Sequence, residues 1–215
     1  MKIDCLGHSC FKVTLKNGVR ILFDPYDDNI GYKPSEVEAD IVVVSHAHYD
    51  HNNLAHIIGE YTLVNKPGKY NFDDFSIEGF KTFHDCEKGA LRGENTVFLV
   101  TVKGLRLCHM GDLGCMPDDD VINNIKGTEI LMIPVGGNYT LDAEHALKVC
   151  EAISPNIIIP MHFKTPASVL DIAPVYDFLE AARSEYDVSH LGKCSFTVDK
   201  SSLKKRTRIM VMEYL

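Results

Sequence analysis

The sequence predicts an α/β (α+β) fold in which two β-sheets pack face to face with helices outside, as a four-layer αββα sandwich. Two observations support it: a hairpin pattern occurs twice, and each copy is followed by a short buried strand and a helical segment. Two similar units of this kind can bury their apolar faces against each other. We expect residues 1–215 to form a single domain with pseudo-repeated halves, about 1–90 and 91–215.

The two hairpins lie at residues 7–24 (GHSCFKVTLKNGVRILFD) and 93–112 (GENTVFLVTVKGLRLCHMGD). In each, apolar and polar residues alternate on both sides of a short glycine turn, which is typical of a β-hairpin. Each second strand ends in an aspartate, Asp24 or Asp112. The sandwich would therefore place both polar strand ends at one rim.

The segments after the hairpins complete the two halves. Short buried strands are expected at 39–46 (ADIVVVSH) and 128–135 (TEILMIPV). A helix is expected at 52–60 (NNLAHIIGE), and a second from Asp142, a good N-cap, to Ile153. The remaining expected elements are strands at 61–65, 75–84, 156–162 and 208–214, and an amphipathic helix at 174–185.

Composition and charge exclude several classes of partner. The formal net charge is −8, which disfavours binding to nucleic acid or to an anionic membrane, and the basic run at 204–208 is interpreted as a solvated turn. No apolar run approaches the ~20 residues of a membrane span, and residues 1–11 lack the apolar stretch of a signal peptide. The chain is therefore expected to be cytoplasmic, with a small molecule as its partner. Self-association into a homo-oligomer is left open.

The seven cysteines also bear on the kind of site. Their number is odd and no CxxC pair occurs. This argues against both a disulfide framework and a zinc site built from thiolates. Any metal site in this chain should therefore use histidines and carboxylates.

The stretch VVVSHAHYDHNN (42–53) places three histidines and an aspartate directly after a buried strand. His46 and His48 are two residues apart, so on extended backbone their side chains point the same way and can hold one ion. Asp50 and His51 come where the chain must turn, so a second, neighbouring ion is their natural partner. Imidazoles and carboxylates suit first-row divalent metals.

Three further candidate ligands stand at strand ends. His84 closes FKTFHD, Asp112 closes LCHMGD and His162 closes IIIPMH. A single polar residue at a strand end needs no special explanation. Three independent strand ends that each finish in a metal-competent residue are hard to explain by core packing, and together with 42–53 they indicate a metal site.

In this order, the motifs resemble those of the metallo-β-lactamase superfamily, whose fold is an αββα sandwich, and the resemblance covers essentially the whole chain. The ligands that it implies are His46, His48 and His84 for one metal, Asp50, His51 and His162 for a second, and Asp112 as the bridge. Asp24 would brace the metal loop without being a ligand. Two divalent ions are implied, zinc first, with manganese or iron as alternatives. The motifs GHSCF, HMGDLG, VGGNYT and PMHF are similar to the small-hydrolase branch that includes ascorbate-phosphate lactonase.

The expected activity is hydrolysis of a small lactone, ester or phosphorylated compound by a hydroxide that bridges two metals, formed from water whose pKa falls to about 7. Asp50 is the expected catalytic carboxylate, and His8 is a second candidate for the pocket. Tyr139 and Thr140, after a Gly-Gly loop, are candidate substrate contacts.

The sequence leaves two other functions open, and two further histidines could lie near the site. A phosphodiesterase or nuclease of the same fold would need a basic groove, and a non-catalytic metal-binding protein would be expected to lack a ligand. His109 is expected to support the site without being a ligand, and His145 to lie on the surface.

Overall fold

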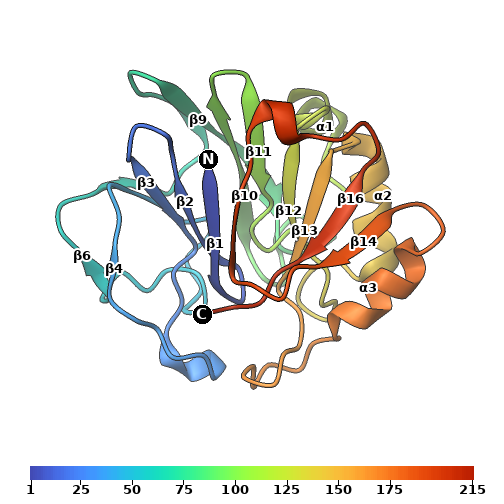
Figure 1. Cartoon of the computed structure of the whole chain (residues 1–215). Helices are drawn as coiled ribbons and strands as arrows, with labels where there is room; N and C mark the ends of the chain where they lie inside the picture. The colour runs from blue at the N-terminus through green and yellow to red at the C-terminus, as the bar shows by residue number, and fades with distance from the viewer.

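The computed structural model describes all 215 residues and contains two large β-sheets that face each other (Figure 1). The first sheet consists, in spatial order, of β15 (Ser195–Thr197), β1 (Lys2–Gly7), β2 (Cys10–Thr14), β3 (Arg20–Phe23), β5 (Ile41–Val43) and β7 (Thr62–Val64). The second consists of β14 (Asp187–His190), β16 (Arg208–Val211), β13 (Ile157–Met161), β12 (Ile130–Pro134), β11 (Leu105–His109), β10 (Glu94–Val102), β9 (Phe75–Phe83) and β8 (Gly68–Asn71). The predicted mixed α/β fold is confirmed.

Alternation along the strands builds two apolar clusters. Because successive side chains of a strand point to opposite faces, Ile21 and Val43 enter the core between the sheets, which contains 43 buried residues. Leu22 and Val42 point the other way and join a cluster of 8 buried residues on the outer face of the first sheet. The first sheet is therefore covered on both faces.

The two predicted hairpins are confirmed, and each continues in the same way. The hairpin β2–β3 is followed by β5, which pairs parallel to β3, and the hairpin β10–β11 is followed by β12, which pairs parallel to β11. The Arg20 N–H donates to Asp40 Oδ2 (2.7 Å), and the Arg106 N–H donates to Glu129 Oε2 (2.8 Å). The division near residue 90 stays a prediction. The sheets do not follow it strictly, because β8 and β9 join the second sheet and β15 joins the first.

The helices are α1 (Asp119–Ile125), α2 (Ala143–Ile153) and α3 (Val175–Ala182), and α2 and α3 lie on the outer side of the second sheet (Figure 1). The helices predicted from Asp142 and over 174–185 are confirmed as α2 and α3. The Asp142 side chain caps α2 by accepting the His145 N–H (2.9 Å). None of the helices combines the length and the apolar character needed to cross a lipid bilayer.

The helix predicted at 52–60 is wrong. This segment forms turns and the short strand β6 (Ile57–Ile58), which pairs with β4 (Val37–Glu38). Asn53 Oδ1 accepts the Ala55 N–H (3.1 Å), and such a side-chain bond to nearby backbone favours a turn over a helix. The outer layer over the first sheet is therefore irregular chain with this ribbon and a 3₁₀ turn, η1 (Asp28–Ile30). A second 3₁₀ turn, η2 (Lys200–Ser202), precedes β16.

Strand direction brings the polar strand ends to one edge. β10 is antiparallel to both β9 and β11, and β11, β12 and β13 are mutually parallel. The carboxyl ends of β9, β11 and β13 therefore share one edge of the second sheet. His84, Asp112 and His162 lie in the loops just after these ends.

Candidate metal centre

Asp112 lies at the centre of a cluster of histidines. Its Oδ2 atom is 3.1 Å from His84 Nε2 and 3.1 Å from His162 Nε2, and its Oδ1 atom is 3.1 Å from His51 Nε2. His46 Nε2 lies 3.9 Å from Oδ2. These four histidines come from three separate loops, so the fold itself has assembled the cluster.

On one side of Asp112 lies a group formed by His46, His48 and His84. His46 Nε2 is 3.0 Å from His48 Nδ1. The extended backbone predicted for this pair is wrong: β5 ends at Val43, and residues 45–48 form bends. The Ser45 N–H donates to the Asp24 carboxylate instead of to a neighbouring strand, so strand pairing does not continue through this segment. The rings of His46 and His48 nevertheless lie next to each other, with centroids 4.5 Å apart.

On the other side lies a group formed by His8, Asp50, His51 and His162. Asp50 Oδ2 is 3.6 Å from His51 Nε2 and 3.4 Å from His8 Nε2. The rings of His8 and His162 are 4.1 Å apart. The fold thus brings together all seven predicted ligands, in the two groups that the resemblance implied, and adds His8 to the second. Their binding of metal stays a prediction.

The donor atoms fit a divalent ion. Within each group the donor atoms lie within 4.8 Å of one another. Of the ten buried side-chain nitrogen and oxygen atoms that lack a hydrogen-bond partner, seven belong to His8, His51, His84, Asp112 and His162. Buried polar atoms are normally paired, so these atoms require something to satisfy them. Imidazole nitrogen and carboxylate oxygen are the donors that zinc, manganese and iron share.

Asp24 lies behind the ligands and sets their orientation. Its carboxylate accepts the Ser45 N–H (2.7 Å), the Ser45 O–H (2.6 Å) and His51 Nδ1–H (2.9 Å). Ser45 Oγ then accepts His46 Nδ1–H (2.9 Å). Both imidazoles thereby use Nδ1 for this contact and direct Nε2 at Asp112, so that Nε2 is the nitrogen each would offer to a metal.

The electrostatics of the cluster favour a cation. Burial, reinforced by neighbouring imidazoles, lowers the pKa of His46 to about 3 and the pKa of His8 to about 4, so both rings are neutral, as metal ligands must be. Burial raises the pKa of Asp112, but the imidazoles of His162 and His51 outweigh this and hold it well below its usual value. Burial also lowers the pKa of His51, yet the carboxylates of Asp112 and Asp50 raise it well above its ordinary value. These carboxylates thus stabilise positive charge between them.

Backbone strain is concentrated at the same place. His8, Asp24 and His162 have φ values of 54°, 43° and 52°, in the left-handed region that side chains other than glycine rarely adopt. Gly136 allows its loop to reach His162, because a Cβ at this position would collide with the His162 carbonyl oxygen. Such strain persists only where surrounding structure holds it, and it commonly marks functional sites.

A cavity of about 340 Å³ opens over the cluster. It is lined by His48, Tyr49, Asp50, His84, Arg92, Asp112, Tyr139 and Leu170. Of the predicted substrate contacts, Tyr139 lies on this lining, whereas Thr140 is buried and does not. His8 is also absent from the lining, on the buried side of Asp50.

Two further histidines weighed in the sequence, His109 and His145, lie outside the donor groups. His109 is buried, its Nε2–H donates to the Ser9 carbonyl oxygen (2.9 Å), and its ring stacks on Phe23. His145 is exposed and bonded to Asp142. Neither ring is among the groups of candidate metal donors.

Sequence reasoning missed three residues of the site: Ser45, Asn95 and Arg92. Asn95 Oδ1 accepts the Asp112 N–H (3.0 Å), and Asn95 Nδ2 donates to the Met110 carbonyl oxygen (2.9 Å), so Asn95 shapes the loop that carries Asp112. A polar side chain at the start of the apolar run TVFLV was the signal that could have identified it. Ser45 and Arg92 carried no comparable signal.

Comparison with known proteins agrees with this geometry. The model of the family described as Beta-lactamase superfamily domain matches residues 2–162. A metal-dependent hydrolase of Carboxydothermus hydrogenoformans is 34% identical over 207 residues, covering 82% of this chain and 91% of the relative.

Two solved structures are also similar. A candidate zinc-dependent hydrolase of the metallo-beta-lactamase superfamily from Thermotoga maritima superposes with a TM-score of 0.81 and 31% identity, covering 100% of this chain and 99% of that one. Igni18, a metallo hydrolase of Ignicoccus hospitalis, has a TM-score of 0.69 at 23% identity, covering 99% and 94% of the two chains, and shows the fold alone.

Proposed function

Because the chain belongs to the beta-lactamase superfamily and is a metal-dependent hydrolase, we propose that it holds two divalent ions and hydrolyses a small lactone, ester or phosphorylated compound. The position of Asp112, between two groups of histidine and carboxylate donors, carries this proposal. The ligands would be His46, His48 and His84 for one ion, Asp50, His51 and His162 for the other, and Asp112 for both. Zinc is proposed first, with manganese or iron as alternatives that use the same donors.

When bound, divalent cations supply Lewis acidity, which lowers the pKa of water to about 7 and polarises the oxygen of an electrophile. Asp50 is the carboxylate of this site best placed to contact both a cation and an attacking water. Its carboxylate lines the cavity, and its pKa is held below the usual value because the nearby imidazoles of His51 and His8 outweigh the effect of burial. Asp50 is therefore ionised at neutral pH, and its carboxylate can ligate a cation and orient an attacking water by accepting a hydrogen bond from it.

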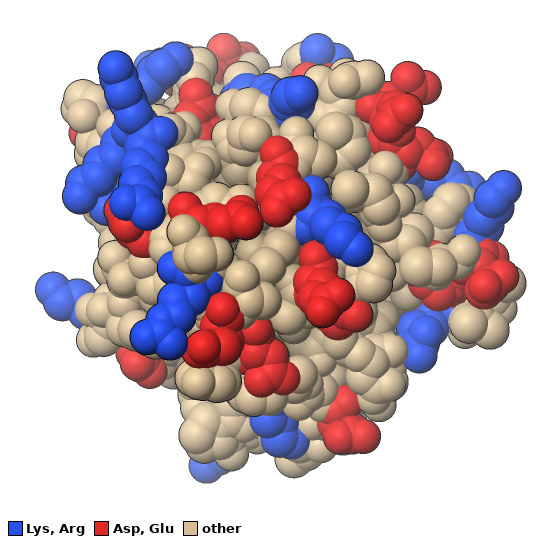
Figure 2. Space-filling view, turned by 90° about the vertical axis from the view of Figure 1, so that its right-hand side faces the viewer, with Lys and Arg blue, Asp and Glu red and all other residues tan.

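The cavity favours a small substrate over a polymer. Its walls include Tyr49, Tyr139 and Leu170, and its volume is in the range of small-molecule sites. A nuclease would need a basic groove along which a phosphate backbone could lie. The net charge is −8, and Figure 2 shows acidic and basic side chains interspersed on the helix-bearing side of the molecule.

The test combines metal analysis with a panel of substrates. Protein purified without chelators should contain two ions per chain and should hydrolyse lactones or esters faster than bis-p-nitrophenyl phosphate or single-stranded nucleic acid. Asp50→Asn should lose this activity, and Asp120→Asn, the same change at an exposed aspartate of α1, should retain it. A single ion per chain, or faster cleavage of nucleic acid, would contradict the proposal.

A further inference from the structure

The cavity over the metal centre includes one side chain that the proposed hydrolysis leaves without a role, that of Arg92. It is half-buried and is the only lysine or arginine among the residues that line the cavity. Every other polar side chain on this lining is a histidine, a tyrosine or an aspartate. A permanent positive charge therefore lies on the wall of the cavity over the candidate metal centre.

The guanidinium of Arg92 is not used by the protein. Arg20, Arg183 and Arg206 each bind a carboxylate of this chain. By contrast, the Arg92 guanidinium forms neither a salt bridge nor a side-chain hydrogen bond, and it lies over the ring of Tyr139, whose centroid is 5.7 Å from Cζ. A guanidinium stacked on an aromatic ring keeps its N–H edge free for a planar anion.

The backbone that carries Arg92 is held in place relative to the metal centre. Asp85, next to His84, accepts four backbone N–H groups at 2.7 to 3.0 Å, those of Glu87, Gly89, Leu91 and Arg92. The His84 N–H donates to the Gly93 carbonyl oxygen (3.1 Å), which closes the loop at its other end. Arg92 is therefore fixed at a set position beside His84, as pre-organised recognition requires.

We propose that Arg92, supported by Tyr139, binds an anionic group of the substrate while the bond to be cleaved lies at the metal centre. This inference rests on the proposed function and names its substrate class: small lactones or esters that carry a carboxylate or a phosphate away from the reacting bond. Both anions match the fork of a guanidinium, with which they form paired hydrogen bonds. In a chain of net charge −8, a local cation also offsets the general repulsion of anions.

The kinetic test uses matched substrates that differ only in charge. Wild type, Arg92→Ala and Arg92→Lys would be assayed on 4-nitrophenyl butyrate, which is neutral, and on mono-4-nitrophenyl succinate and a phosphate-bearing nitrophenyl ester. Arg92→Ala should raise KM about 10- to 100-fold for the anionic esters, the range expected for loss of a charge-assisted pair, with KM for the neutral ester unchanged. Arg92→Lys should fall between, because it keeps the charge and loses the fork.

The matched control is Lys88→Ala, which removes one positive charge from the exposed part of the same loop and should change neither KM. Equal effects of Arg92→Ala on charged and neutral esters would overturn the proposal. The relative effects on the carboxylate and phosphate esters identify which anion the site prefers.

A binding measurement separates this inference from the proposed function. Inorganic phosphate and glutarate would be titrated into metal-loaded protein while the Arg92 Nε–H resonance, assigned by its loss in Arg92→Lys, is followed. A saturable shift supports the anion site even if no ester is hydrolysed, in which case the proposed function alone fails. A resonance that does not respond to either anion overturns the anion site, whatever the hydrolysis assay shows.

Discussion

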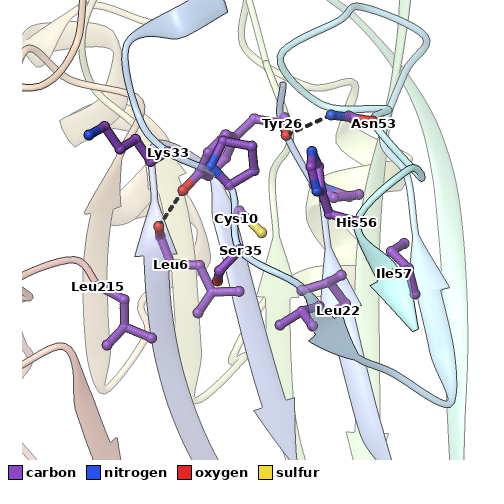
Figure 3. Close-up of a pocket in the computed structure, with 13 residues that line it drawn as sticks. Leu6, Cys10, Leu22, Tyr26, Lys33, Ser35, Asn53, His56, Ile57 and Leu215 are labelled. Carbon is purple, nitrogen blue, oxygen red and sulfur yellow. Dashed lines mark hydrogen bonds between the residues drawn. The ribbon is translucent and has the colours of Figure 1, made fainter. Parts of the chain in front are cut away.

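Two cavities of this molecule differ in what their polar atoms do. One lies on the outer face of the first sheet and is lined by residues that include Leu6, Leu22, Tyr26 and Asn53 (Figure 3). There the Tyr26 O–H donates to the Leu6 carbonyl oxygen (2.6 Å), and Asn53 Nδ2 donates to the Tyr26 carbonyl oxygen (3.3 Å). In the cavity over the metal centre, by contrast, Asp112 Oδ1 has no hydrogen-bond donor.

This difference separates a site built for packing from a site built for a ligand. A buried polar group without a partner costs about 1–3 kcal/mol, so a cluster of such groups is stable only if something completes it. In the outer pocket, the side chains of Tyr26 and Asn53 are hydrogen-bonded to the chain itself. In the cavity over the candidate metal centre, histidine and carboxylate atoms lie close together while several of them lack a hydrogen-bond partner. This arrangement identifies the cavity as the candidate functional site.

The largest effect should come from Asp112→Asn. This change keeps the volume but removes the charge shared by the two donor groups, so hydrolysis should fall by about 10²–10³-fold or more. Activity and metal content would be measured together. Asp120→Asn is the matched control, and wild-type activity in Asp112→Asn would show that the centre is not where the reaction occurs.

Removal of the metal should come next. Each ion present at 100 times its dissociation constant raises the free energy of unfolding by about 2.7 kcal/mol, which for a chain of this size is about 5–10 °C in Tm per ion. Calorimetry before and after chelation measures this. If the same shift appeared in Asp112→Asn, the stabilising ions would be bound elsewhere.

Asp24→Asn should weaken metal binding by about 10- to 100-fold, the usual effect of losing a residue that orients a ligand. An amide cannot accept all three of the hydrogen bonds that Asp24 receives from Ser45 and His51. Competition with a chromophoric chelator gives the affinity. Asp4→Asn, at another buried aspartate of the first sheet, should leave it unchanged, and equal losses in the two variants would argue against orientation as the cause.

The smallest effect is expected in the outer pocket. Tyr26→Phe removes one hydrogen bond to Leu6 and should lower the free energy of unfolding by about 1 kcal/mol, with no change in metal content or kcat/KM. Denaturant titration and the ester assay measure the two quantities. A marked loss of activity would break the distinction between the two cavities.

Much of the site could be predicted because its signals are local. Asp24, His84 and Asp112 each follow a strand whose alternation is visible in the chain, and His162 follows an apolar run. The spacing of His46 to His51 indicated two pairs of ligands, and the family resemblance completed the two groups. The helix expected at 52–60 failed for a local reason as well, since the side chain of Asn53 bonds the backbone of Ala55. Its apolar spacing was helical, but turn chemistry decided the conformation.

The sequence by itself determined the two hairpins, the buried strands that follow them, the polar residues at their ends and the available metal donors, because alternation and ligand chemistry belong to single segments. Only the tertiary structure decided that Asn95 accepts the Asp112 N–H and that Arg92 lies over Tyr139. It also decided that Ser45 Oγ links the Asp24 carboxylate to His46 Nδ1 by hydrogen bonds. Asn95 and Arg92 meet partners that are distant in the chain, and the orientation that Ser45 gives His46 depends on Asp24, which lies on another strand end. Such contacts leave no periodic pattern and exist only after the sheets have packed.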